Sequence, residues 1–281
     1  MTIAVTGATG RFGRLVIESL RTEIPQGSLI ALARSPDKAR DLGVEMRAFD
    51  YDQADLLAPA LEGVETLLLI SSNDIANRVR QHADVIVAAR QAGVGRIVYT
   101  SLLHADTSCL DVAAQHLATE AELAASALST TILRNGWYTE NYTDLVPRAL
   151  ARGAFPGCAG DASIASAIRA DYAEAAAAVL TSGGHAGKVY ELAGDTAWTL
   201  PELAAEISHQ AGRVIPYEDM TQACYAATLR SLGLPDELAE AFAGWDVAAS
   251  QGALFHHGHQ LSDLIGRHTT PLADAVRAAI R

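Results

Sequence analysis

The sequence predicts an α/β fold in which a doubly wound parallel sheet is followed by a smaller, mostly helical C-terminal part. Short runs of β-branched or leucine residues alternate with helical stretches through the first half of the 281 residues. The runs cover residues 3–6, 29–33, 45–49, 66–70, 96–101 and 130–133. Each parallel connection needs a crossover of about a dozen residues or more, so this rhythm implies helices on both faces of one sheet.

A glycine motif follows the first predicted strand and begins the first helix. Its residues are Gly7-Ala8-Thr9-Gly10-Arg11-Phe12-Gly13, with the spacing G-x-x-G-x-x-G. Glycines allow a tight turn and bring backbone N–H groups against a pyrophosphate, while the helix N-terminus adds partial positive charge. The motif therefore predicts a Rossmann-like dinucleotide site, in preference to a turn that only packs the helix on the strand.

The end of the second predicted strand indicates which dinucleotide is bound. Sites selective for NAD place an Asp or Glu there for the ribose 2′-hydroxyl, whereas this chain has Arg34. A guanidinium binds a 2′-phosphate through a fork of N–H groups, and Ser35 and Lys38 follow closely in sequence. We therefore expect NADPH as the cofactor, the alternative being a solvated Arg34 ahead of a helix. Residues 50–52, after the third strand, either border the adenine or cap the next helix.

The regular alternation of strands and helices ends near residue 135, where loops rich in glycine and aromatic residues begin. We expect an NADP(H)-binding Rossmann domain over residues 1–135 and a smaller substrate-side domain over residues 136–281. A strand near residues 188–193 is expected to return to the sheet of the first domain. Among the helix signals, Ser35 is expected to be an N-cap ahead of Pro36, and Asp171 to cap a helix that ends near residue 180.

Small polar residues end the fourth and fifth predicted strands, at the carboxyl edge where parallel sheets bind ligands. Residues 71–73 (Ser-Ser-Asn) follow the fourth strand, and Ser101 ends the fifth. Ser101 stands where a short-chain dehydrogenase keeps its catalytic serine, but no tyrosine of the chain is followed four residues later by a lysine. The usual tyrosine acid, activated by a lysine, is therefore not expected.

Composition limits the partners and the location. The formal net charge of −12 argues against nucleic-acid or anionic-membrane binding, because both depend on clustered Lys and Arg. No apolar run reaches the about 20 residues of a membrane helix, and the N-terminus leaves no room for a secretory signal ahead of the glycine motif. Cys109, Cys158 and Cys224 are widely spaced, which suits a reducing compartment, so we expect a cytoplasmic protein. Residues 256–259 (His-His-Gly-His) are not accompanied by further metal ligands at the spacing that structural metal sites use, so no metal site is expected.

Several motifs together carry a resemblance to a known family. Besides the glycine motif they are residues 99–106 (Tyr-Thr-Ser-Leu-Leu-His-Ala-Asp), 133–138 (Leu-Arg-Asn-Gly-Trp-Tyr), 169–172 (Arg-Ala-Asp-Tyr) and 233–236 (Gly-Leu-Pro-Asp). With these motifs the sequence resembles the NmrA-like atypical short-chain dehydrogenases, in particular their bacterial quinone oxidoreductases, alongside triphenylmethane reductase. The resemblance covers essentially the whole chain.

The resemblance implies an NADPH-dependent, two-electron reduction of quinones without a bound flavin. It places the pyrophosphate on the glycine motif, the 2′-phosphate on Arg34, the cofactor ribose at residues 71–73, and the nicotinamide and substrate at residues 135–138. The cofactor-binding residues expected are Gly7, Ala8, Thr9, Gly10, Arg11, Phe12, Gly13, Arg34, Ser71, Ser72, Asn73, Asn135 and Gly136. The catalytic residues expected are Asn135, Trp137, Tyr138 and His104, and the partners a small-molecule quinone and a second copy of the chain in a homodimer.

Direct hydride transfer suits a site without the tyrosine–lysine pair, because a quinone is already electrophilic and positioning does most of the catalytic work. We therefore expect Asn135, Trp137 and Tyr138 to orient the acceptor, with no essential general acid. Two alternatives stay open. A redox sensor that binds NADP(H) and controls a protein partner would also lack the pair, and the same cofactor geometry permits the reduction of cationic triphenylmethane dyes.

Overall fold

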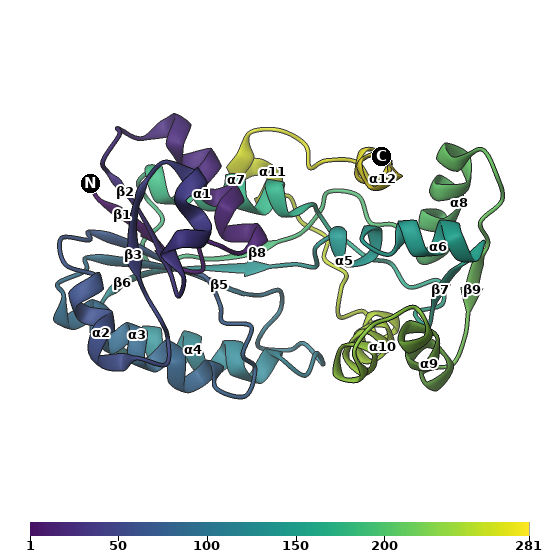
Figure 1. Cartoon of the computed structure of the whole chain (residues 1–281), viewed down its shortest axis with the longest axis horizontal. Helices are drawn as coiled ribbons and strands as arrows, with labels where there is room; N and C mark the ends of the chain where they lie inside the picture. The colour runs from purple at the N-terminus through teal and green to yellow at the C-terminus, as the bar shows by residue number, and fades with distance from the viewer. Residues whose placement is uncertain (281) are drawn as a thin grey trace.

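The computed structural model describes residues 1–280 and has two halves, a seven-stranded parallel sheet between helices and a mostly helical second half (Figure 1). The strands are β1 (Ile3–Val5), β2 (Leu29–Ala33), β3 (Glu45–Ala48), β4 (Thr66–Leu69), β5 (Arg96–Leu102), β6 (Ser129–Asn135), β7 (Phe155–Gly157), β8 (Val189–Leu192) and β9 (Tyr217–Asp219). The helices are α1 (Arg11–Glu23), α2 (Ala54–Ala60), α3 (Arg78–Gln91), α4 (Ala113–Ala125), α5 (Glu140–Thr143), α6 (Val146–Arg152), α7 (Arg169–Thr181), α8 (Leu200–Ala211), α9 (Gln222–Ser231), α10 (Asp236–Ser250), α11 (Gln260–Ile265) and α12 (Leu272–Ile280), with the 3-10 helix η1 (Pro36–Leu42).

The sheet has the strand order β3-β2-β1-β4-β5-β6-β8, and every pair in it is parallel. The order reverses between β1 and β4, which is where doubly wound sheets open a crevice at the carboxyl ends of their strands. Helices α2, α3 and α4 lie on one face, and α1, α7 and α11 on the other (Figure 1). The predicted doubly wound parallel fold is therefore confirmed, and residues 189–192 do return to the sheet beside β6.

The side chains of the buried strands point alternately to the two faces of the sheet, so there is a core on each face. On one face, Val98 and Leu133 pack with the alanine-rich side of α7. On the other, Ile97 and Ile132 pack against α3. Because successive residues of a strand point to opposite faces, a single apolar run supplies both cores at once.

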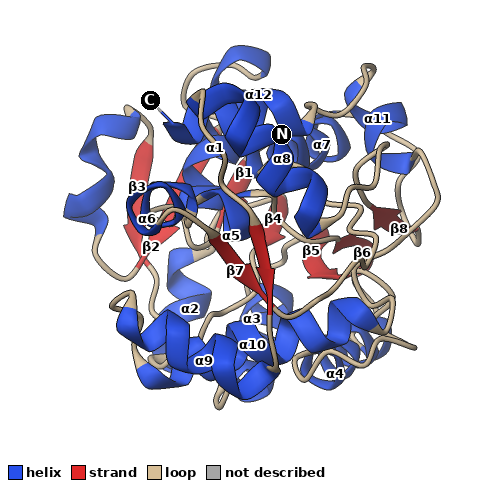
Figure 2. Ribbon diagram, turned by 90° about the vertical axis from the view of Figure 1, so that its right-hand side faces the viewer, coloured by secondary structure: helices blue, strands red, loops and turns tan. Residues whose placement is uncertain are grey.

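The second half contains a two-stranded sheet, in which β7 pairs with β9, among helices α5, α6, α8, α9, α10 and α12. Figure 2 looks onto this half, with β7 in front and α9 and α10 below it. Its core includes Phe155 and Tyr225, both fully buried, and Trp198, whose ring centroid lies 5.5 Å from that of Tyr142. The sheet half therefore comprises α7, β8 and α11 in addition to the residues before 136.

Of the two predicted helix caps, one occupies its predicted position and the other does not. Ser35 is the N-cap of η1, a 3-10 helix, ahead of Pro36, although its hydroxyl makes no capping hydrogen bond. The N-cap of α7 is Ile168, and Asp171 lies inside the first turn with its carboxylate fully buried. That carboxylate accepts hydrogen bonds from Arg267 Nη2 at 2.8 Å and from the Thr270 amide and hydroxyl at 2.8 and 2.9 Å. The expectation that Asp171 caps the helix is wrong, because its side chain turns inward and anchors the segment between α11 and α12.

Within residues 1–280, no helix combines the length and the apolar character that crossing a membrane requires.

Removal of the Asp171 carboxylate should destabilise the fold. In Asp171→Ala, three donors lose a buried, charged acceptor, so we expect the free energy of unfolding to fall by about 3 kcal/mol in urea titrations followed by circular dichroism. Glu174 on the same helix also pairs with Arg267, but at the surface. The control Glu174→Ala should therefore change the free energy by no more than about 0.5 kcal/mol. Equal losses in the two variants would contradict the anchoring role of Asp171.

Candidate active site

A cavity of about 540 Å³ opens at the carboxyl edge of the sheet, above the point where the strand order reverses. It collects most of the expected cofactor residues. Those that line it are Gly7, Thr9, Gly10, Arg11, Phe12, Gly13, Arg34, Ser71, Ser72 and Asn73, together with residues 49–52, Asp74, Gln81 and Arg169, among others. Ala8 is fully buried behind the loop.

The glycine motif forms a tight turn that brings α1 close to β1. Gly7 has a φ of +59°, and its carbonyl accepts the Gly10 N–H at 2.9 Å. A Cβ at Gly13 would stand 2.4 Å from the Gly7 carbonyl oxygen, so only glycine fits there. Gly10 is the N-cap of α1 and supplies no side-chain cap, which leaves the first amides of the helix for a ligand. This cradle fits a pyrophosphate.

Arg34 stands exposed at the wall of the cavity, directly after β2. In the part of the chain that the structure describes, no hydrogen bond or ion pair engages its guanidinium. Opposite it, Asp52 accepts hydrogen bonds from Gln81 Nε2 at 3.0 Å and Arg80 Nη2 at 2.5 Å, and these bonds lower the pKa of Asp52. Helix α2 begins after Gln53 and has no side-chain cap, so residues 50–52 do not cap it. They border the cavity instead.

Arg169, the first residue of α7, also lines the cavity, although sequence reasoning assigned it no role. Its Nη2 donates to Asn141 Oδ1 at 2.9 Å, while its buried Nη1 has no hydrogen-bond partner. Its guanidinium carbon lies 4.8 Å from the centroid of the Tyr138 ring, and burial lowers the pKa of Arg169. Nη1 lies 3.7 Å from Glu140 Oε2, so the guanidinium is ion-paired at the edge of the cavity although this nitrogen makes no hydrogen bond. Only its place just before a predicted helix could have hinted at this.

Asn135 ends β6 and is 5% exposed, yet neither the nitrogen nor the oxygen of its carboxamide has a hydrogen-bond partner. A buried carboxamide left without partners costs free energy, and Asn135 itself is not among the residues that line the cofactor cavity. Gly136 follows, and a Cβ there would stand 2.8 Å from the Leu192 carbonyl oxygen. The chain can therefore pass β8 closely only because residue 136 is glycine.

The side chains of Trp137 and Tyr138 pack against different halves of the molecule. The Tyr138 ring stacks on Phe12 of the glycine motif, with centroids 6.1 Å apart, and lies beside Arg169; both neighbours line the cofactor cavity, whereas Tyr138 does not. The Trp137 ring meets Trp245 of α10 edge to face, with centroids 5.2 Å apart, and packs against the core of the second half. The Tyr138 ring thus faces the glycine motif of the sheet half, and the Trp137 ring faces the core of the second half.

The hydroxyl of Ser101 is not free for catalysis of the short-chain dehydrogenase type. It donates to Glu120 Oε1 at 2.5 Å. Glu120 also pairs with Arg134 Nη2 at 2.7 Å, and the Arg134 guanidinium contacts Glu191 and Asp106 as well. These hydrogen bonds and ion pairs raise the pKa of Arg134. Ser101 is therefore part of a structural ion network between β5, β6 and α4.

His104 lies after β5 in a left-handed conformation, with a φ of 53°, which residues other than glycine seldom adopt. The backbone N–H of His104 donates to Glu191 Oε2 at 2.8 Å, and the ring Nε2 lies 3.2 Å from His256 Nδ1. It lines a separate cavity of about 220 Å³ with residues 107–109 and 251–253. The structure thus places His104 at the boundary between the halves, outside the lining of the cofactor cavity.

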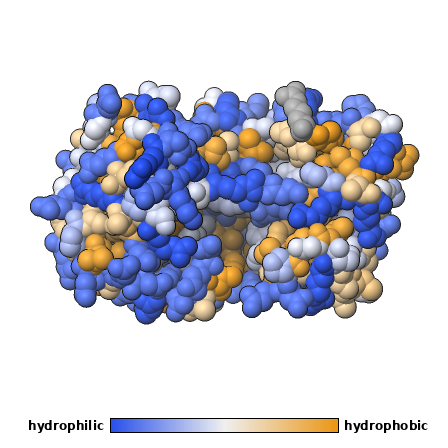
Figure 3. Space-filling model, in the orientation of Figure 1, coloured by the Kyte–Doolittle hydropathy of each residue, from blue (hydrophilic) through white to orange (hydrophobic). Residues whose placement is uncertain are grey.

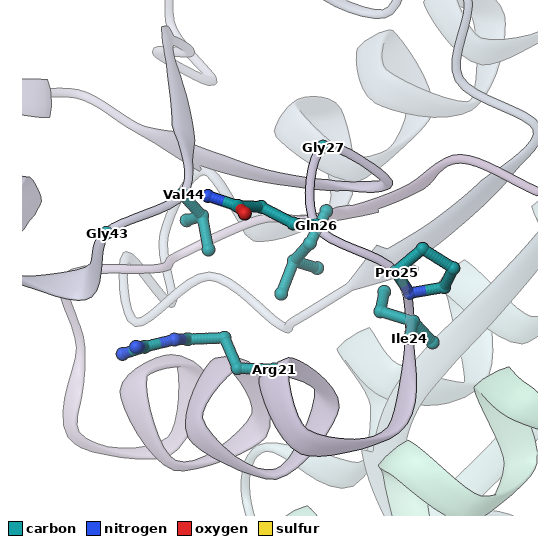
Figure 4. A pocket seen from close by; sticks show the side chains of 8 residues that line it. Arg21, Ile24, Pro25, Gln26, Gly27, Gly43 and Val44 are labelled. Atoms are coloured by element: carbon teal, nitrogen blue, oxygen red, sulfur yellow. The ribbon is translucent and has the colours of Figure 1, made fainter.

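A cavity of about 340 Å³ lies between the end of α1 and the turn before β2, and Arg21 and Gln26 extend along it (Figure 4). It sits at the amino ends of strands, where parallel sheets seldom bind ligands. Figure 3 shows the surface hollowed where the two halves meet. Among the described residues, no three His, Cys, Asp or Glu side chains are placed to hold a metal ion.

Comparisons with known proteins agree with this geometry. A family model described as NAD(P)H-binding matches residues 7–187. Quinone oxidoreductase 2 of Escherichia coli K12 is 53% identical over 277 residues, which cover 98% of this chain and 97% of the relative. The crystal structure of an E. coli NADPH-dependent quinone oxidoreductase complexed with NADPH matches with a TM-score of 0.96 at 52% identity and covers 100% of both chains. Citrobacter sp. triphenylmethane reductase complexed with NADP(H) matches with a TM-score of 0.95 at 38% identity, over 99% of this chain and 100% of that one.

Gly13→Ala should disturb both the fold and the cradle. The added Cβ would overlap the Gly7 carbonyl, so α1 must move away from β1, at a cost of about 2 kcal/mol in the free energy of unfolding. We expect the affinity for NADPH, measured by isothermal titration calorimetry, to fall at least about tenfold, a change of about 1.4 kcal/mol. In the control Gly183→Ala the new Cβ meets nothing within 4 Å, so both quantities should stay unchanged. Wild-type affinity in Gly13→Ala would refute the cradle.

Proposed function

We propose that the chain catalyses the NADPH-dependent two-electron reduction of quinones. The chain belongs to the NAD(P)H-binding family and, within it, to the NmrA-like branch. The proposal adds that hydride passes directly from the nicotinamide to the quinone, without a flavin between them. The cavity at the carboxyl edge carries the proposal, because the glycine cradle and the unpaired Arg34 line it together. The acceptor class follows from the relative named a quinone oxidoreductase, which matches this chain along its full length.

The residues present fit NADPH. The backbone amides of the glycine motif would hold the pyrophosphate, and Arg34 the 2′-phosphate, through a guanidinium that pairs with no acidic side chain within residues 1–280. Residues 71–73 would bind the cofactor ribose. The buried carboxamide of Asn135, with both polar atoms unpartnered, is suited to bind the nicotinamide carboxamide. Arg169 would add a second cation next to Tyr138.

When bound, NADPH supplies a hydride to the quinone, and a proton from water completes the hydroquinone. The chain's own contribution is to hold two flat rings in contact and to exclude water around them. Tyr138 and Asn135 would form the cofactor side of this space, and Trp137 with Trp245 the wall on the side of the second half. Burial raises the pKa of the Tyr138 phenol, which makes it a weaker acid and favours a packing role over proton donation.

The proposal also places the protein in the cytoplasm as a homodimer. Cys109, Cys158 and Cys224 are all unpaired, as expected in a reducing compartment. Val79 and Val87 on α3 are exposed apolar side chains on the outer surface of the sheet half, available for contact with a second copy. The role of His104 is proposed to be an orienting one at the boundary between the halves.

The main test is anaerobic stopped-flow absorbance at 340 nm with NADPH and a simple benzoquinone. We expect multiple turnovers without added flavin, and a protein spectrum without flavin absorbance near 450 nm. Arg34→Ala should weaken NADPH binding by about tenfold to a hundredfold and leave NADH binding nearly unchanged, because it removes a charge-assisted bond to the 2′-phosphate. Arg40→Ala on the 3-10 helix that follows Arg34, where Arg40 pairs with Asp37, is the control and should change neither. Tight NADPH binding with no turnover on any quinone would overturn the enzyme proposal and favour a redox sensor.

A second prediction concerns the proton. If Tyr138 only packs and orients, Tyr138→Phe should keep the single-turnover hydride rate within about threefold of wild type, which is under about 0.7 kcal/mol of barrier. The raised pKa of the Tyr138 phenol also means that its titration lies above the neutral range, so the rate should be flat between pH 6 and pH 9. Tyr138→Leu, which removes the ring that stacks on Phe12, should slow the reaction much more. A large loss in Tyr138→Phe would make the phenol an essential acid and refute direct transfer without one.

A further inference from the structure

One face of α3 holds the loop that carries Ser72, at the edge of the cofactor cavity. Arg78 Nε donates to the Ser72 carbonyl oxygen at 2.7 Å, and the Ser72 hydroxyl donates to Gln81 Oε1 at 2.5 Å. The Ser72 amide donates to His82 Nε2 at 2.9 Å. Residues 78, 81 and 82 are spaced i, i+3 and i+4, so they share one side of the helix. All three polar groups of Ser72 are therefore bonded by side chains of one helical turn.

The bonds of His82 determine the state of its ring. Because Nε2 accepts from Ser72, the single proton of the neutral ring is on Nδ1, which lies 2.9 Å from Thr119 Oγ1. The Thr119 hydroxyl in turn donates to the Gln115 carbonyl oxygen at 3.0 Å, so its oxygen is free to accept. His82 is fully buried, and burial together with the nearby Arg78 lowers its pKa to about 3. The ring is thus neutral at working pH and has one tautomer.

We propose that His82 is a positioning residue for the cofactor, because its Nδ1-protonated ring holds the Ser72 amide and so fixes the loop of residues 71–73 at the wall of the cofactor cavity. It acts through Ser72 and does not touch the cofactor. The role attributed to the loop rests on the proposed function. The hydrogen bond itself belongs to the free protein, so it can be tested without NADPH.

The molecule offers a matched control in a second buried histidine. His116 on α4 is 6% exposed, its Nδ1 lies 2.8 Å from the Tyr99 hydroxyl, and burial lowers its pKa to about 3 as well. It does not line the cofactor cavity. A histidine that only fills the core would behave alike at both positions, whereas a positioning role predicts a difference between them.

The first experiment is hydrogen–deuterium exchange mass spectrometry on the free protein, following the peptide of residues 67–77. In His82→Leu the Ser72 amide loses its acceptor, so exchange in this peptide should become about tenfold faster. His82→Gln, whose side-chain oxygen can reach the position of Nε2, should restore most of the protection. His116→Leu should leave the peptide unchanged even where it lowers Tm by as much as His82→Leu does. Should His82→Leu not fold, Thr119→Val removes the partner of Nδ1 and is expected to speed exchange of the same peptide by a smaller factor.

The second experiment compares two variants by calorimetry. His82→Leu should raise the Kd of NADPH about tenfold, whereas His116→Leu should leave it within about twofold of wild type. The proposal is overturned if His82→Leu leaves both exchange and NADPH affinity unchanged, or if His116→Leu reproduces its effects. A wild-type protein that binds no NADPH would refute the proposed function, and the exchange measurement would still decide whether His82 holds the loop.

Discussion

The close approach of α1 to the end of β1 is the constraint on which the rest of the site depends. Gly13 lies so near the Gly7 carbonyl that no side chain fits between them. This contact places the first amides of α1 at the crevice where the strand order reverses, in the cavity that Arg34, directly after the neighbouring strand β2, also lines. Every other group of the cavity must be placed relative to this cradle, which makes the backbone of one turn the reference point of the site.

Local sequence signals predicted the sheet well, and they selected most of the residues that line the cavity at its carboxyl edge. The apolar runs coincide with β1, β2, β4, β5 and β6 because strands buried on both faces need nearly continuous apolar residues, whereas β3, at the edge of the sheet, has no buried residue. The glycine motif and Arg34 could be assigned from sequence because each follows a strand directly, so the topology alone brings them to one edge. Residues 71–73 line the same cavity for the same reason.

The remaining features depend on partners far away in sequence. Arg169 reaches the cavity because α7 returns to pack against α1, and no local pattern carries that information. Ser101 lies where a catalytic serine is usual, but the bond to Glu120 engages its hydroxyl, since the buried Arg134 needs that carboxylate nearby. Asp171 was expected to be a cap because first-turn acids commonly are, yet its partners come from about a hundred residues later in the chain. Spacing within a helix cannot distinguish these cases.

The anchoring of the segment between α11 and α12 has a consequence for how the chain is made. The Asp171 carboxylate and its partners Arg267 and Thr270 are separated by most of the second half of the polypeptide. During synthesis from the N-terminus, the sheet can assemble early, but this buried carboxylate stays without its donors until about a hundred further residues have been made. A chain that terminates before residue 267 therefore loses more than a peripheral helix. It exposes an unsatisfied charge beside the central sheet, a defect that cellular quality control can detect in incomplete products.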